Sequence, residues 1–188
     1  VKSNLEEVDR MSQIITDLLT LSRLSENDLY ESSKFSPVNL NRLVSKTNER
    51  LANVAKNTNI QLILNLPSSD VIVTSNELLI EAVVMNCIKN AILYNKPNGT
   101  VTTTLSKTNS EAIIIVQDTG IGMSQDDADK IFDRFYRVDK SRSRQTGGSG
   151  LGLSIVKSAI DRLGGKVSIS SELDKGTTMT VFLPLKKL

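Results

Sequence analysis

The stretch GGSGLGLSIV, residues 147–156, constrains the fold more than any other part of the chain. Its glycines lead into apolar residues three or four positions apart, which predicts a loop feeding an amphipathic helix; these are Leu153, Val156, Ile160 and Leu163. The first amides of a helix lack partners within the helix and carry about half a positive charge. Glycines let an anion reach these amides, so the stretch is suited to holding phosphate, with a plain connector as the alternative.

Composition limits the class of protein. The chain has 188 residues and a net charge of +2, enough for one domain plus an appendage but too little charge for a dedicated nucleic-acid binder. It contains no histidine, which excludes a histidine base, metal ligand or phosphoacceptor within this polypeptide. Cys87 lies in an apolar helical pattern and predicts a reduced core residue in a cytosolic setting. No apolar run approaches the roughly 18 residues of a membrane span and no signal peptide is evident, so no membrane contact is expected here.

Residues 3–25 are predicted to form one helix with a heptad-like apolar stripe that includes Val8, Met11, Ile15 and Leu18. A helix this apolar on one side needs a partner. An interhelical role in a hairpin or bundle is favoured, and docking on its own domain is the alternative. The polar residues 26–36, followed by Pro37, predict a linker. We therefore expect an incomplete helical segment at 1–30 and a domain at 31–188, as in a piece of a longer protein.

The remaining chain alternates strands and helices. Strands are predicted at 35–38, 60–66, 71–74, 100–107, 111–118, 166–172 and 177–185. Helices are predicted at 40–57, at 76–94 with Asn76 as the cap, near 126–135, and after the glycine-rich stretch. The long polar segment 119–149 is typical of a functional lid or of a disordered loop.

Two amides lie on the stripe of helix 76–94 that should enter the core. Asn86 and Asn90 share this stripe with Leu79, Val83 and Leu93. A buried amide without a partner costs about 1–3 kcal/mol, so something must satisfy both. Hydrogen bonds to neighbouring backbone are one explanation. The other is a hydrated magnesium ion with phosphates, because magnesium prefers oxygen ligands and retains several waters.

Asp118 ends a predicted strand and shares its face with Ile114 and Val116. A carboxylate there lies over a pocket floor and is suited to accept a ligand amino group, while Gly120 and Gly122 let the ligand approach the backbone. An ordinary Asx turn is the alternative.

The segment near 126–135 gathers apolar, mostly aromatic residues beside basic ones: Ile131, Phe132, Phe135 and Tyr136, with Arg134 and Arg137. Packing of a lid onto its domain is the simpler interpretation. Alternatively, Arg137 reaches a terminal phosphate and stabilises the charge that develops during transfer. Lys140, Arg142 and Arg144 make the lid basic, either as solvated charge or to attract phosphate.

Five stretches occur in order: NCIKNAILYN, QDTGIGM, KIFDRFYRVD, GGSGLGLSIV and KGTTMTVFLP. They resemble the N, G1, F, G2 and G3 boxes of the catalytic ATP-binding domain of sensor histidine kinases, a Bergerat-fold group shared with type II topoisomerases and ninety-kilodalton heat-shock chaperones. The resemblance covers residues 36–188. It implies an α+β fold, a two-layer α/β sandwich with a mixed sheet and three main helices, preceded by one long helix. That helix resembles the second helix of the dimerisation hairpin, whose histidine-bearing first helix is absent.

The resemblance implies a role for each matching residue. Asn90 ligates Mg2+ and, with Arg137, forms the catalytic set; Asp118 accepts the adenine amino group. The remaining implied ATP contacts are Asn86, Tyr94, Gly120, Gly122, Tyr136, Gly148, Ser149, Gly150, Leu151, Gly152, Leu153 and Thr178. One departure is Leu93, where the family usually has lysine. Lys89 could replace the positive charge missing at position 93. Its direction speaks against this, because Lys89 points about 100° from Asn90 on an ideal helix.

Two functions follow from the resemblance. As an enzyme part, the domain uses Mg-ATP to phosphorylate a histidine on the missing helix, and a response regulator then takes the phosphoryl group on aspartate. The intact kinase is expected to form a homodimer through its hairpin and to be anchored in the bacterial cell membrane with this domain in the cytoplasm. The alternatives are an ATP-driven clamp and simple nucleotide binding. The F box and the opening helix favour the kinase.

Overall fold

The computed structural model describes residues 2–25, 35–138 and 149–185. Its main feature is a five-stranded sheet in the order β2-β4-β5-β7-β6, in which β2 runs parallel to β4 and the other neighbours are antiparallel. The strands are β2 (Gln61–Asn65), β4 (Thr100–Lys107), β5 (Glu111–Asp118), β6 (Lys166–Glu172) and β7 (Gly176–Pro184). A separate antiparallel pair joins β1 (Ser36–Asn39) to β3 (Ile72–Ser75).

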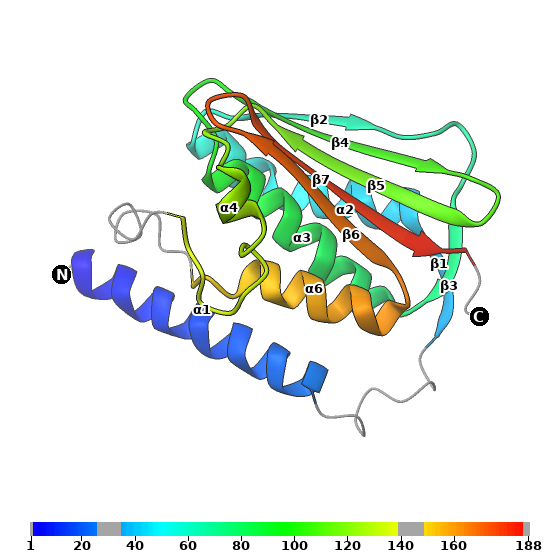
Figure 1. The fold of residues 1–188 in the computed structure, drawn as a ribbon, viewed down its shortest axis with the longest axis horizontal. Coiled ribbons are helices and arrows are strands. Elements are labelled where there is room, and N and C mark those ends of the chain that lie inside the picture. The colour runs from blue at the N-terminus through cyan, green and yellow to red at the C-terminus, as the bar shows by residue number, and fades with distance from the viewer. Residues whose placement is uncertain (1, 26–34, 139–148, 186–188) are drawn as a thin grey trace.

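Helices α2 (Leu40–Asn57), α3 (Glu77–Leu93) and α6 (Gly152–Leu163) form a layer over one face of the sheet (Figure 1). Helix α3 lies between the other two and is apolar on most sides, and eight of its residues are buried. Asn76 caps it by accepting the N–H of Leu79 at 3.2 Å. The predicted α+β class, with a mixed sheet and three main helices, is confirmed.

The core forms where strand alternation meets this helical layer. In β4, Val101, Thr103 and Leu105 point inward, and the paired strand β5 adds Ala112, Ile114, Val116 and finally Asp118. Alternation therefore delivers one carboxylate to the buried face at the end of an otherwise apolar row. This position puts Asp118 next to α3 at one end of the sandwich.

Most predicted boundaries lie within one residue of the observed ones, and one helix differs clearly. The helix expected near 126–135 is α4 (Gln125–Ala128), and residues 129–137 follow as turns and irregular backbone. Two tertiary interactions replace the helix. Phe135 takes a φ of 64° and donates its N–H to the Gly150 carbonyl at 3.0 Å, and the Tyr136 hydroxyl donates to Asp127 Oδ1 at 2.6 Å.

Helix α1 (Lys2–Ser25) runs beside α6 (Figure 1). Leu21 is buried in the same core as the domain, so one face of α1 docks on its own domain, the alternative that the sequence favoured less. Val8, Met11, Ile15, Leu18 and Leu19 remain exposed on this helix. The predicted linker falls mostly on residues 26–34, which lie outside the described residues. No helix in the described ranges is long and apolar enough to span a membrane.

Candidate functional site

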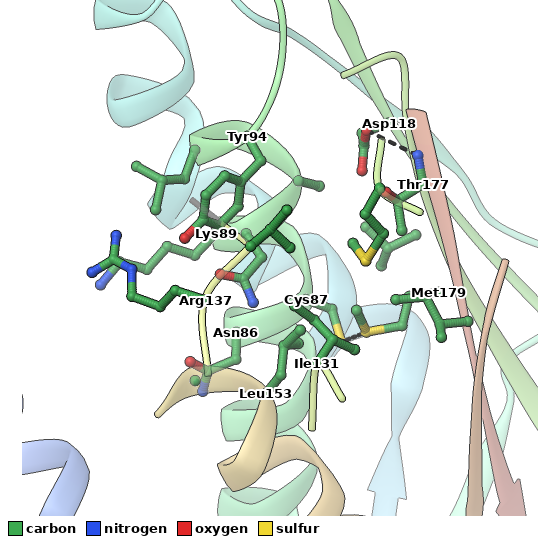
Figure 2. Close-up of a pocket in the computed structure, with 18 of the residues that line it drawn as sticks. Asn86, Cys87, Lys89, Tyr94, Asp118, Ile131, Arg137, Leu153, Thr177 and Met179 are labelled. Atoms are coloured by element: carbon green, nitrogen blue, oxygen red, sulfur yellow. Dashed lines mark hydrogen bonds between the residues drawn. The ribbon is translucent and has the colours of Figure 1, made fainter. Parts of the chain in front are cut away.

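A cavity of about 220 Å³ lies between α3, the C-terminal end of β5, the first residues of β7 and the start of α6. Figure 2 shows its two sides: Asn86 and Lys89 of α3, with Tyr94 just after this helix, lie across from Asp118, Thr177 and Met179 of the sheet. Its floor is apolar and rich in sulfur, because the Cys87 thiol lies 3.1 Å from Met179 Sδ. Burial raises the pKa of Cys87 to about 12, so this thiol stays protonated and behaves as a small apolar group.

Asp118 is the buried acid of the cavity, with 9% of its surface exposed. Its Oδ1 accepts the N–H of Gly120 at 2.8 Å and the N–H of Thr177 at 3.1 Å. Burial raises the pKa of this carboxyl above its ordinary value, and the two backbone N–H groups oppose that rise. Both bonds end on Oδ1, and within the described residues Oδ2 accepts none, so the second oxygen is available to a ligand donor.

The turn at residues 119–122, directly after Asp118, continues the cavity wall. Gly120 is buried, and Gly122 lines the cavity with a φ of 62°. A side chain at position 122 would also place Cβ 1.9 Å from the Glu172 carbonyl oxygen. Glycine is therefore required here by both backbone conformation and space.

The two asparagines of α3 meet the start of α6. Asn86 Nδ2 donates to the Ala82 carbonyl at 2.8 Å, and its Oδ1 lies 2.8 Å from where a Cβ on Gly152 would be. Asn90 Nδ2 lies 3.8 Å from the same point. Backbone bonding thus satisfies part of Asn86, as the simpler interpretation expected. Both side chains also line the cavity, where the phosphate interpretation requires them.

Lys89 also lies in the cavity wall (Figure 2). Its direction on the helix therefore does not keep Lys89 out of the wall, and whether it compensates for Leu93 stays a prediction. A lysine stem is long enough to bring its charged end round the helix surface.

The start of α6 lies at the cavity. Leu151 is the N-cap residue and makes no side-chain capping bond, and its side chain is buried. Ser149, Gly150, Gly152 and Leu153 line the cavity. The first backbone N–H groups of α6 therefore lie at the cavity wall. A phosphate oxygen there can accept hydrogen bonds from them. Gly148 lies outside the described residues.

The segment before this loop supplies Ile131, Tyr136 and Arg137 to the wall. Tyr136 is fixed by its hydroxyl bond to Asp127, whose Oδ2 accepts the Ser124 hydroxyl at 2.6 Å. These bonds lower the pKa of Asp127, and the same carboxylate raises the pKa of Tyr136. Ser124 and Asp127 therefore hold Tyr136 at the cavity.

Two residues of the cavity wall, Thr177 and Asp17, were not predicted from the sequence. Thr177, not Thr178, lines the cavity, because the inward row of β7 runs through Thr177, Met179 and Val181. Thr178, the predicted residue, pairs with Gln117 on the other face and is not among the residues that line the cavity. Alternation from Met179 would have found Thr177. Asp17 of α1 also lines the cavity, and nothing in the local sequence indicates this.

Similarity to known proteins covers nearly the whole chain. Residues 75–187 match the histidine kinase-, DNA gyrase B- and HSP90-like ATPases. The sensor histidine kinase RppB of Synechocystis sp. is 43% identical over 176 residues, 94% of this chain and 38% of RppB. The sensor histidine kinase WalK of Bacillus subtilis is 37% identical over 96% of this chain and 30% of WalK. Full-length ShkA in complex with AMPPNP is similar at 25% identity with a TM-score of 0.81, over 97% of this chain and 37% of that one. The chain spans about a third of the length of these curated relatives.

Proposed function

Because the chain belongs to the histidine kinase-, DNA gyrase B- and HSP90-like ATPases, as the catalytic ATP-binding domain of a sensor histidine kinase, we propose that it phosphorylates a histidine from ATP. The acceptor histidine lies outside these 188 residues, which contain none. The observation that carries the proposal is the cavity itself, which joins a buried carboxylate to the uncapped start of a glycine-led helix.

We propose that adenine binds at the sheet end of the cavity. The 6-amino group donates to Asp118 Oδ2, because Oδ1 already accepts two backbone N–H groups. The apolar floor formed by Cys87, Met179 and Val116 suits a flat purine, and Tyr94 lies at the rim to cover it. Guanine has a carbonyl oxygen at that position. Two hydrogen-bond acceptors, this oxygen and the carboxylate of Asp118, would then face each other without a donor between them.

The triphosphate extends toward α6 in this proposal. The first amides of α6, Asn86 and the side chains of Lys89 and Arg137 surround its path. A carbonyl oxygen from Asn90 fits Mg2+, which takes few protein ligands when phosphate oxygens and waters complete its shell. The described residues contain no cluster of three histidine, cysteine or acidic side chains, which agrees with such a sparse site. When bound, Mg2+ neutralises phosphate charge.

Transfer then depends on positioning and charge stabilisation. Asn90 and Arg137 form the catalytic set: Asn90 orients the terminal phosphates, and the guanidinium of Arg137 stabilises their developing charge. The second acceptor is a response-regulator aspartate. The exposed apolar residues of α1 support homodimerisation of the intact kinase, for which we also propose membrane anchoring with this domain in the cytoplasm. The alignments with the named relatives cover 94% and 96% of this chain and so include at least part of α1, which favours a kinase over an ATP-driven clamp.

Transfer of labelled phosphate tests this proposal. The chain is incubated with Mg2+, γ-labelled ATP and a separate polypeptide that carries the histidine helix of the hairpin. We expect acid-labile label on the supplied helix and none on this chain, and the Arg137→Ala variant should transfer far more slowly. Label on the chain itself, or ATP binding without any transfer to the supplied helix, would contradict the proposal.

A further inference from the structure

A hydrogen bond links α1 to the phosphate end of the cavity. Ser149, 132 residues away in sequence, donates its hydroxyl to Asp17 Oδ2 at 2.6 Å. Asp17 is 8% exposed, and both residues line the cavity. A carboxylate from α1 is therefore part of the wall proposed to receive a triphosphate.

Asp17 lies on the docked face of α1. Ile14 is half-buried and Leu21 is buried, three residues before and four residues after Asp17, which puts all three on one side of the helix. A buried carboxylate is costly unless hydrogen bonds compensate it, and bonds to a charged acceptor are short and strong. The bond to Ser149 therefore helps hold this face of α1 against the domain.

The same serine is bonded to the start of α6. Ser149 Oγ accepts the N–H of Leu151 at 3.2 Å, and Leu151 is the N-cap residue of α6. The Asp17 carboxylate is thus connected through one hydroxyl to an amide at the anion-binding helix end. Its negative charge lies where the proposed function puts phosphate charge, and like charges at close range repel.

We propose that Asp17 makes docking of α1 and binding of the ATP phosphates compete. Docked α1 engages Ser149 and presents its carboxylate to the phosphate site, whereas a bound triphosphate weakens the Asp17–Ser149 contact and releases this face of α1. The coupling is reciprocal, so whatever moves α1 changes nucleotide affinity by the same factor. This inference rests on the proposed function and adds a means of regulating it.

Calorimetry with Mg-AMPPNP tests the inference on the complete chain. The Asp17→Ala variant should bind about tenfold more tightly than the original chain, a gain of about 1.4 kcal/mol. Asp161→Ala is the matched control, since Asp161 is an exposed carboxylate on α6 paired with Lys157 at 2.7 Å. It should leave affinity unchanged. Unchanged or weaker binding by the Asp17→Ala variant would overturn the inference while leaving the proposed function intact.

Hydrogen exchange on the unaltered chain provides a second test that does not depend on a variant folding. Saturating Mg-AMPPNP should increase exchange of the α1 amides around Asp17 and Leu21. Equal or slower exchange there with nucleotide bound would contradict competition. If the original chain, Asp17→Ala and Asp161→Ala all fail to bind Mg-AMPPNP, the proposed function fails and the inference fails with it.

Discussion

Asp118 Oδ1 accepts the backbone N–H of Thr177 at 3.1 Å, which ties the end of β5 to the start of β7 at the cavity wall. The bond fixes one carboxylate oxygen in the protein and leaves the other at the cavity that Asp118 lines (Figure 2). The proposed adenine contact would then use Oδ2, while Oδ1 serves the protein, and substitutions can separate the two roles.

Asp118→Asn should weaken ATP binding strongly while keeping the local fold. The amide oxygen still accepts both backbone N–H groups, but an NH2 group replaces the oxygen that faces adenine. An unpaired buried donor costs about 1–3 kcal/mol, so we expect roughly a tenfold to hundredfold loss of affinity. Calorimetry with Mg-AMPPNP measures it, with Asp161→Asn as the control. Equal affinity in the two variants would count against adenine at Asp118.

The same substitution should stabilise the empty domain at neutral pH. Burial raises the folded-state pKa of Asp118, so the folded state holds its proton more tightly than the unfolded state. Stability therefore falls as pH rises from the unfolded pKa through the folded pKa, and the penalty persists above it. Thermal unfolding should show Asp118→Asn more stable than the original chain at pH 7 and similar to it below both pKa values. A lower unfolding temperature at pH 7 would refute this explanation.

Asn90→Ala should reduce magnesium-dependent binding more than magnesium-independent binding. The substitution removes the carbonyl oxygen proposed to ligate Mg2+ and leaves the Asp118 end unchanged. We expect the ratio of ATP affinities with Mg2+ and with a chelator to fall toward one. Asn53→Ala, at an exposed position of α2 outside the cavity lining, is the control. An equal loss with and without metal would argue that Asn90 acts by another route.

Cys87 should resist thiol reagents in the native state. Its pKa is raised to about 12 by burial, and it is 2% exposed, so thiolate is scarce and hard to reach at pH 8. A chromogenic disulfide reagent should titrate one thiol per chain after unfolding and react far more slowly before. Rapid reaction of the folded chain would show that the cavity floor opens readily.

The sequence predicted the elements that depend on local periodicity. Alternation placed Asp118 on the buried face of β5, and helical spacing placed Asn86 and Asn90 on one side of α3. Both patterns are set by neighbours within a few residues, so tertiary contacts did not change them.

Features that depend on distant partners could not be predicted. The helix expected near 126–135 stops at Ala128. Beyond it, the Tyr136 hydroxyl donates to the Asp127 carboxylate, and the Phe135 N–H donates to the Gly150 carbonyl instead of to a helical partner. Docking of Asp17 depends on Ser149, 132 positions away. Each of these contacts overrides a local preference, and only a three-dimensional structure reveals it.

A crystal structure of this chain with AMPPNP and Mg2+ tests the central claim most directly. We predict the adenine amino group within hydrogen-bond distance of Asp118 Oδ2, the phosphates at the first amides of α6, and the metal beside Asn90. A nucleotide bound elsewhere, or an adenine that leaves Asp118 unbonded, would contradict the account.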